Sequence, residues 1–203
     1  MKVNIELSPM ERIREIIKRQ NGSLYTSDLS KLGIPRTYLS ILLDSGEIQK
    51  ISRAVYASPN SIVDEMAIIQ TRFKAAIFSH ETALYFLGLT DRTPLNYSVT
   101  VPSSYNATSL KVCGAKVYFI KRELYLLGII NINSSHGNIL RTYNLERTIC
   151  DVIRNRKQMD IQFINEALKK YVNHKDRNID QLYYYAEKFR VQKLIRNTIE
   201  VLL

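Results

Sequence analysis

The spacing of apolar residues predicts helices towards both ends of the chain and strands between them. Isoleucines recur at helical spacing behind Ser8-Pro9, which suit an N-cap and a first helical residue, and Asn21-Gly22 ends this helix. Short helices are expected over residues 27–32, capped by Thr26, and over residues 36–45. The inward positions of the three helices are Ile13, Ile16, Ile17, Leu29, Leu32, Leu39, Leu42 and Leu43.

A hairpin is expected directly after these helices. Residues 48–51 and 54–57 are β-type runs joined across Ser52-Arg53. Two short helices connected by a turn that contains Gly33, followed by a hairpin of this size, are typical of a winged helix-turn-helix. We therefore expect a DNA-binding domain over residues 1–60.

A second domain is expected over residues 61–203, behind a hinge at Ser58-Pro59-Asn60. Its predicted helices cover residues 61–76 (capped by Ser61, with Asp64 at the capping-box position), 79–87, 145–154 (capped by Asn144), 161–174 (capped by Asp160) and 181–203 (capped by Asp180, with a break near Arg190-Val191). Its predicted strands, about four in number, cover residues 97–101, 115–120, 128–132 and 139–143. The fold class is therefore α+β: an N-terminal winged helix-turn-helix, then a mixed domain with a small sheet and a helical C-terminal end.

The helix over residues 36–45 leaves a polar face at its N-terminal end, where a recognition helix meets the edges of bases. Arginine suits a bidentate bond to guanine, and hydroxyl side chains suit bases, phosphates or sugars. Cationic residues on the hairpin suit phosphate contact or insertion into the minor groove. The predicted DNA-binding residues are Arg36, Thr37, Tyr38, Ser40, Lys50 and Arg53. The alternative is that these side chains form only the solvated face of a small helical module.

Composition indicates a folded protein with an anionic partner. The 203 residues are 45% hydrophobic and 24% charged, which is ordinary for a globular chain and excludes collagen-like, low-complexity and membrane classes. The 29 Lys and Arg residues exceed the 19 Asp and Glu residues, giving a formal net charge of +10. Such a charge favours nucleic acid first, and an anionic membrane surface or an acidic partner second. The excess is spread over both predicted domains.

The sequence carries no pattern typical of a metal or redox site. Cys113 and Cys150 have no C-x-x-C neighbour, and both are expected to be buried thiols. His80, His136 and His174 are scattered without clustered carboxylates. We expect no catalytic residue, no metal and no cofactor. The first six residues carry no apolar run typical of a secretory signal, so a cytoplasmic location without membrane association is expected.

Two motifs in the second predicted domain resemble signature stretches of the AbiEi family of antitoxins. The first is Ser79-His80-Glu81-Thr82-Ala83-Leu84 with Gly88-Leu89 behind it, and the second is Asn144-Leu145-Glu146-Arg147-Thr148-Ile149-Cys150-Asp151. The N-terminal helices and the hairpin from Gly46 to Tyr56 also resemble that family, so the resemblance covers nearly the whole chain.

The resemblance implies the antitoxin of a type IV toxin–antitoxin system, which acts in abortive infection and phage resistance. Such an antitoxin represses its own operon by binding promoter DNA, expected to carry inverted repeats, through the winged helix. It also counters a nucleotidyltransferase-like toxin without a stable antitoxin–toxin complex. The second domain is then the part expected to neutralise the toxin.

The two motifs also have a structural interpretation that is independent of the family. Ser79 and Asn144 are suited to capping helices. His80 is expected to be a hydrogen-bonded structural residue rather than a general base, because no nucleophile or orienting acid is adjacent. Arg147 and Asp151 stand four residues apart and can form an ion pair, together with Glu146, as a structural cluster or as part of a surface.

Basic residues of the C-terminal helices form a second candidate site. A positive face there would hold DNA by phosphate contact or meet RNA on which the toxin acts. The predicted face consists of Lys169, Lys170, Lys175, Arg190, Lys193 and Arg196, with Tyr183-Tyr184-Tyr185 as candidates for stacking on bases. The alternative is that these side chains merely cover the surfaces of their helices.

Two other classes of function are considered. One is a nuclease or other DNA-acting enzyme delivered by a winged helix, but the strand ending at Ile120 is followed by Lys121-Arg122-Glu123, without the paired carboxylates that hold a metal. The other is a winged helix that mediates protein contacts only, because the fold alone does not prove DNA binding.

Overall fold

The computed structural model describes residues 7–199. The residues on which the expectation of no secretory signal rests lie outside this range, as do the last four residues of the last predicted helix. The described chain divides into two compact units. Unit 1 comprises the residues up to Lys74 together with Asn133–Leu140, and unit 2 comprises Ala75–Ile132 and the residues from Arg141 onwards. The predicted functional domains, residues 1–60 and 61–203, stay a prediction.

Unit 1 consists of short helices around a small antiparallel sheet. Its elements are α1 (Pro9–Arg19), β1 (Ser23–Tyr25), α2 (Thr26–Lys31), α3 (Thr37–Asp44), β2 (Gln49–Ser52), β3 (Val55–Ala57) and α4 (Glu65–Arg72). The strands are ordered β1-β3-β2, so the three residues that precede α2 pair with the hairpin. The core of this unit contains Ile13, Leu24, Leu29, Ile34, Leu39, Leu42 and Ile48.

Local hydrogen bonds explain where the helices of unit 1 begin. Ser8 caps α1 as predicted, in a capping box with Glu11. The prediction that Thr26 caps α2 is wrong, because Tyr25 is the N-cap and its backbone N–H donates to Asp28 at 3.2 Å. The prediction that Ser61 caps the next helix is also wrong. Asp64 is the N-cap of α4 and accepts from the backbone N–H of Ala67 at 3.1 Å, so the helix starts later and is shorter than expected.

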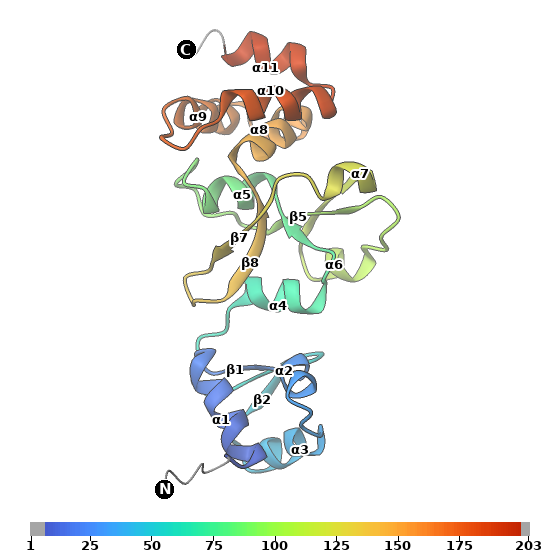
Figure 1. Cartoon of the computed structure of the whole chain (residues 1–203), viewed down its shortest axis with the longest axis vertical. Coiled ribbons are helices and arrows are strands. Elements are labelled where there is room, and N and C mark those ends of the chain that lie inside the picture. The colour runs from blue at the N-terminus through green and yellow to red at the C-terminus, as the bar shows by residue number, and fades with distance from the viewer. Residues whose placement is uncertain (1–6, 200–203) are drawn as a thin grey trace, which may run out of the picture. The chain divides into compact units, whose positions relative to one another are not determined.

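Unit 2 combines a five-stranded mixed sheet with a helical C-terminal end (Figure 1). Its elements are β4 (Ile77–Phe78), α5 (His80–Phe86), β5 (Ser98–Pro102), α6 (Thr108–Val112), β6 (Lys116–Ile120), α7 (Arg122–Tyr125), β7 (Ile129–Asn133), β8 (Ile139–Tyr143), α8 (Leu145–Arg154), a 3-10 turn (Arg156–Gln158), α9 (Ile161–Val172), α10 (Ile179–Lys188) and α11 (Gln192–Ile199). The last residue of β7 and the first two of β8 belong to the segment Asn133–Leu140 that is grouped with unit 1. The strand order is β6-β5-β4-β8-β7, with β4 antiparallel to β5 and parallel to β8.

The α+β class and the helical C-terminal end are confirmed. The predicted strands are all present, and β4 adds a fifth at the centre of the sheet. Asn144 and Asp160 cap α8 and α9 as predicted, with side-chain oxygens that accept backbone N–H groups. The prediction that Asp180 caps the next helix is wrong, because Asn178 accepts from the backbone N–H of Gln181 at 2.9 Å. The expected break near Arg190 is present between α10 and α11.

The two cysteines differ in their surroundings. Cys150 is buried in α8, as predicted. Cys113 is exposed, so the prediction that this thiol is buried is wrong. Cys113 directly follows α6, a short helix whose last residue, Val112, is exposed as well. Between residues 7 and 199, no helix is both long and apolar enough to cross a membrane.

Candidate nucleic-acid interface

A groove of about 410 Å³ lies in unit 1 between α3 and the β2–β3 hairpin. We call it the Arg36 groove. It is lined by Thr26, Arg36, Leu39, Ser40, Leu43, Lys50, Arg53, Ala54 and Tyr56. Four of the predicted DNA-binding residues, namely Arg36, Ser40, Lys50 and Arg53, are therefore brought together.

Helix α3 presents its polar side chains because its apolar ones are held in the core. Leu39 and Leu42 are buried and anchor the helix. Arg36 and Ser40 are four residues apart, so they share one face of α3, and both are exposed. Arg36 is also the N-cap residue of α3, which places it at the end of the helix that the sequence pattern indicates for base contact.

The hairpin tip is fixed by contacts with its neighbours. The tip consists of Arg53 and Ala54, one residue later than predicted, because Ser52 pairs with Val55 after a register shift behind Lys50. Ala54 adopts a φ of 66°, a left-handed conformation that few residues other than glycine adopt. Its carbonyl accepts from the backbone N–H of Thr26 at 3.1 Å, which ties the tip to the start of α2. Arg53 is thus presented from a tethered turn.

The groove is positively charged because its cations have no acidic neighbours. Of the described residues that line it, three are cationic and none is acidic. Arg36, Lys50 and Arg53 make no ion pair within residues 7–199, whereas elsewhere in this unit Arg14 pairs with Glu47 at 2.8 Å. Unpaired cations around a polar groove are suited to phosphate groups.

The other two predicted residues do not line the groove. Thr37 is exposed, while Tyr38 is half-buried and packs against the core of unit 1. Sequence reasoning missed Thr26 and Tyr56, which both line the groove. The sequence pattern favours Thr26 as a helix cap and gives no sign of the groove. Tyr56 lies opposite Lys50 in the hairpin, and this cross-strand pairing is the signal that points to it.

Comparison with known proteins concerns the same part of the chain. Residues 11–59 match the family described as transcriptional regulator, AbiEi antitoxin. The match confirms the resemblance to AbiEi antitoxins for the N-terminal region, and it includes Arg36, Ser40, Lys50 and Arg53. It covers about a quarter of the chain, and both AbiEi-like motifs of unit 2 lie outside it.

The fold as a whole is similar to a solved structure. The crystal structure of the RV2827C protein from Mycobacterium tuberculosis matches with a TM-score of 0.58, covering 90% of this chain and 72% of that chain. The two sequences are 12% identical, so the likeness concerns the fold alone. No curated protein matches the chain.

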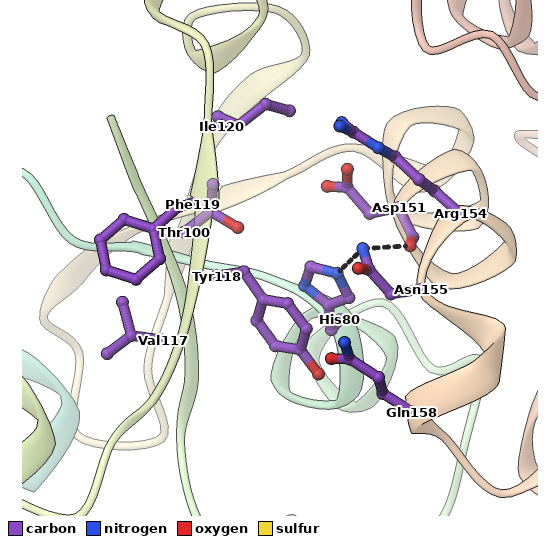
Figure 2. A pocket seen from close by; sticks show the side chains of 10 residues that line it. All are labelled: His80, Thr100, Val117, Tyr118, Phe119, Ile120, Asp151, Arg154, Asn155 and Gln158. Carbon is purple, nitrogen blue, oxygen red and sulfur yellow. Dashed lines mark hydrogen bonds between the residues drawn. The ribbon is translucent and has the colours of Figure 1, made fainter. Parts of the chain in front are cut away.

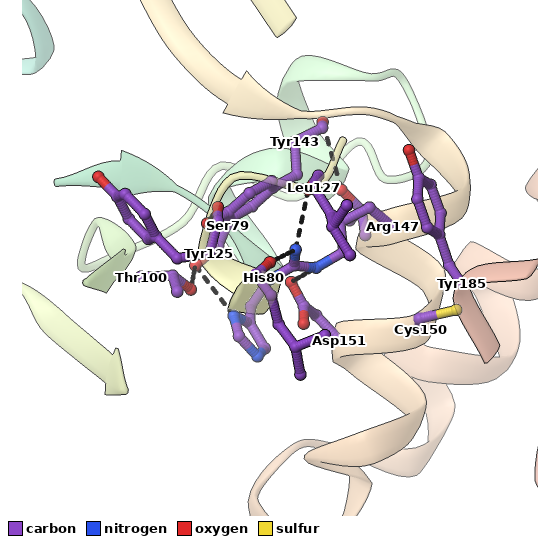
Figure 3. A network of polar contacts seen from close by, with 12 residues as sticks. Ser79, His80, Thr100, Tyr125, Leu127, Tyr143, Arg147, Cys150, Asp151 and Tyr185 are labelled. Carbon is purple, nitrogen blue, oxygen red and sulfur yellow. Dashed lines mark hydrogen bonds and ion pairs between the residues drawn. The ribbon is translucent and has the colours of Figure 1, made fainter. Parts of the chain in front are cut away.

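The two AbiEi-like motifs meet in unit 2 in a buried polar cluster, which we call the Arg147 network (Figure 3). It comprises Ser79, His80, Thr100, Arg147, Asp151 and Asn155. Asn155 joins the motifs, since its side-chain Nδ2 lies 2.9 Å from His80 Nε2 and donates to the carbonyl of Asp151 at 3.0 Å (Figure 2). The expectation that Asn144 caps a helix and that His80 is hydrogen-bonded structure is therefore confirmed. Ser79 is the N-cap residue of α5 but makes no side-chain cap bond, because its Oγ accepts from Thr100 and lies against His80 instead.

His80 is a buried, neutral member of this network. Asn155 Nδ2 donates its two hydrogens to the Asp151 carbonyl and to His80 Nε2, so the ring proton is on Nδ1 and faces Ser79 Oγ at 3.0 Å. Burial, aided by the charges of Arg147, Lys116 and Arg154, lowers the pKa of His80 well below its ordinary value of 6.5. The ring also stacks on Tyr118 with centroids 3.4 Å apart.

Arg147 is the most thoroughly enclosed charge in this cluster, with an exposed fraction of 0%. Its Nε donates to Asp151 at 3.0 Å and its Nη1 donates to the carbonyls of Leu124 and Leu127 at 2.6 and 2.9 Å. The guanidinium carbon lies 4.1 Å from the ring centroids of both Tyr143 and Phe189. Burial raises the pKa of the Asp151 carboxyl, against the effect of Arg147. This ion pair is part of the core and not of a surface.

A polar hollow of about 230 Å³ borders this network (Figure 2). His80, Asp151 and Asn155 line one side of it, and Tyr118 and Arg154 also contribute. Within residues 7–199 there is no group of three or more His, Cys, Asp or Glu side chains that could hold a metal ion.

The predicted C-terminal basic face is spread over three helices and their connections. Lys170 pairs with Asp91 at 2.6 Å, and Lys169, Lys175 and Lys193 are exposed. Arg190 lines a different groove of unit 2, described below. That Lys169, Lys170, Lys175, Arg190, Lys193 and Arg196 act as one surface stays a prediction.

Proposed function

We propose that this protein is a DNA-binding transcriptional regulator that serves as the antitoxin of a type IV toxin–antitoxin system. The Arg36 groove is the observation that carries this proposal. It combines three cations without ion-pair partners and a hydroxyl on one exposed face, within the residues that match AbiEi antitoxin regulators.

In this proposal unit 1 acts as a winged helix-turn-helix. Helix α3 is the recognition helix and the β2–β3 hairpin is the wing. Arg36 reads a guanine in the major groove, Ser40 contacts a base or phosphate, and Lys50 and Arg53 bind phosphates or enter the minor groove. The tethered hairpin tip supports this assignment, because Arg53 is already positioned before DNA arrives.

The remaining parts of the proposal follow the family. The protein represses its own operon by binding inverted repeats in the promoter, and it counters a nucleotidyltransferase-like toxin without a stable complex. Residues 61–203 carry out the neutralisation, without enzymatic activity or a cofactor, and the system acts in phage defence in the cytoplasm.

Promoter binding is tested by fluorescence anisotropy with the upstream promoter duplex and a shuffled duplex of equal length. Arg36→Ala is expected to weaken promoter binding roughly tenfold to hundredfold and to reduce the preference over the shuffled duplex. Arg19→Ala is the matched control, because Arg19 is exposed on α1 outside the groove and pairs with Glu15. Equal loss in both variants would refute the assignment of α3.

The division of labour is tested in cells that carry the toxin and a promoter reporter. Arg36→Ala combined with Arg53→Ala is expected to release repression while toxin neutralisation persists. Loss of both activities, with the protein still folded and abundant, would contradict separate roles for the groove and residues 61–203.

A further inference from the structure

A second groove, of about 490 Å³, lies in unit 2 and has no part in the proposal above. We call it the Tyr184 groove. It is lined by Lys121, Glu123, Leu124, Leu127, Arg154, Tyr184, Lys188, Phe189 and Arg190. These residues come from α7 and its flanks, from the end of α8 and from the end of α10, which packs on α8 (Figure 1).

The rim of this groove is an unneutralised cluster of positive charge. Four cationic side chains face one carboxylate, that of Glu123. None of these four forms an ion pair within the described residues, although other cations of unit 2 do, such as Lys116 with Glu81 at 2.6 Å. Such a rim favours a ligand with at least one phosphate group.

The groove also offers a partly free aromatic ring. Tyr184 is 50% exposed, and the Nζ atom of Lys188 lies 5.4 Å from its ring centroid. Leu124 and Leu127 add apolar surface beside it. An aromatic ring among cations is the combination with which proteins bind unpaired bases and their backbone, whereas a duplex hides the faces of its bases.

Arg190 supplies an independent observation. It follows Phe189, the C-cap of α10, in a left-handed conformation with a φ of 56°, next to the backbone bond from the N–H of Val191 to the carbonyl of Ala186 at 2.9 Å. Glycine is the residue favoured at this position of a helix, because it adopts such a φ without strain. An arginine here therefore adopts a less favourable backbone conformation than glycine would, and its side chain lines the groove.

We propose that the Tyr184 groove binds a nucleotide of a single-stranded nucleic acid. The base stacks on Tyr184, and the adjoining phosphates lie against Lys121, Lys188 and Arg190, with Arg154 adding positive charge. This site is independent of promoter binding, which concerns duplex DNA and unit 1.

The test measures binding of the full-length protein to a fluorescein-labelled RNA oligonucleotide, to the single-stranded DNA of the same sequence, and to the corresponding duplex. Tyr184→Leu is expected to weaken single-strand binding about tenfold and leave duplex binding unchanged. Tyr85→Leu is the control, because Tyr85 is 38% exposed on α5 and lies outside the groove. Preference for RNA or for DNA among the single strands identifies which of the two the groove accepts.

Arg190→Gly separates binding from folding. The glycine relieves the left-handed backbone, so the variant is expected to be at least as stable as the wild type while it binds single strands several-fold more weakly. Lys121→Gln and Lys188→Gln should each lower the slope of log affinity against log salt by about 0.7. Lys111→Gln, at an exposed position outside the groove, should leave the slope unchanged.

Unchanged single-strand binding in Tyr184→Leu and Arg190→Gly would overturn the proposal. So would an equal loss of single-strand and duplex binding, which would mark the groove as a duplex-contacting surface. Neither outcome bears on the promoter assignment, since Arg36→Ala is measured on the promoter duplex.

Discussion

The Arg36 groove of unit 1 and the Arg147 network of unit 2 place the same kind of side chain in opposite surroundings. Arg36 is exposed and has no acidic partner among the described residues, whereas Arg147 is enclosed by Asp151, two carbonyls and two aromatic rings. The guanidinium that is enclosed and bonded through Nε and Nη1 stabilises the protein's own core. The one that is left unpaired is available to a ligand.

The comparison bears on how sequence motifs are interpreted. The AbiEi-like motifs of unit 2 are rich in polar residues, yet these residues are bonded to other groups of the protein itself. Glu81, for example, accepts from Ser98 at 2.7 Å and from Lys116 at 2.6 Å. A motif rich in charged residues can therefore specify packing, and unpaired charge is the better guide to a binding site.

The largest predicted effect comes from breaking the Arg147 network. Arg147→Leu leaves Asp151 buried without its cation and is expected to lower the free energy of unfolding by about 3–5 kcal/mol, measured by chemical denaturation. Arg177→Leu, at an exposed position, should change it little. The double variant Arg147→Leu with Asp151→Leu should recover much of the loss, because no unpaired charge remains. A single-variant loss below about 1 kcal/mol would contradict this account.

Gly128 tests how tightly the same network is packed. A Cβ atom at Gly128 would lie 2.8 Å from both Arg147 Cβ and Asn144 Oδ1, while one at Gly88 would meet nothing within 4 Å. Both glycines have a positive φ, so Gly88→Ala should cost about 1 kcal/mol for the backbone alone. Gly128→Ala should cost about 2–4 kcal/mol in a denaturation experiment, because crowding is added. Equal losses of unfolding free energy in Gly128→Ala and Gly88→Ala would show that the side chains around Gly128 rearrange without an energetic cost.

The buried histidine predicts a pH dependence that the Arg36 groove lacks. The pKa of His80 is lowered in the folded state. Below pH 6.5, the ordinary pKa of histidine, the unfolded chain therefore binds a proton that the folded chain does not. Stability from this residue is therefore complete above 6.5 and is lost as the pH falls, by roughly 1 kcal/mol per pH unit. His80→Asn, which tolerates the φ of 49° at this position, should remove that part of the curve. His174→Gln should retain it, and an unchanged curve in His80→Asn would refute the assignment.

The smallest predicted effect concerns a single phosphate contact in the Arg36 groove. Lys50→Gln should weaken promoter and shuffled duplexes alike, and should reduce the salt slope of binding by about 1. The unfolding free energy should stay the same, since Lys50 is exposed. Lys18→Gln, on the exposed side of α1, should alter neither quantity. If Lys50→Gln changed the unfolding free energy but not the salt slope of DNA binding, Lys50 would be a structural residue and not a phosphate contact.

Much of the fold was predictable where local signals are strong. The bounds of α8 follow from the Asn144 cap and its apolar spacing, and the Ser8 cap likewise places α1. Helix α7 and strand β4 were missed because runs of four and two residues are too short to show a period. The hairpin tip was misplaced because Ala54 carries no signal for its left-handed conformation.

The two candidate grooves also differ in how far local sequence patterns predict them. Arg36 and Ser40 are close in sequence, and Lys50 and Arg53 share one hairpin, so helical spacing and a turn suffice to bring them together. The Tyr184 groove joins Lys121, Arg154 and Lys188, which come from three separate elements. No local pattern places those residues side by side, because tertiary packing decides their proximity.

Strand β4 closes a long loop at the centre of the sheet of unit 2. It lies between β5 and β8, and its contact with β8 joins Phe78 to Thr142 across 64 residues. Closing so long a loop costs chain entropy before the contact stabilises anything. We expect the β5–β6 and β7–β8 pairs to form early and Ile77–Phe78 to join them late. The folding rate of unit 2 is then set by the insertion of two residues at the centre of its sheet.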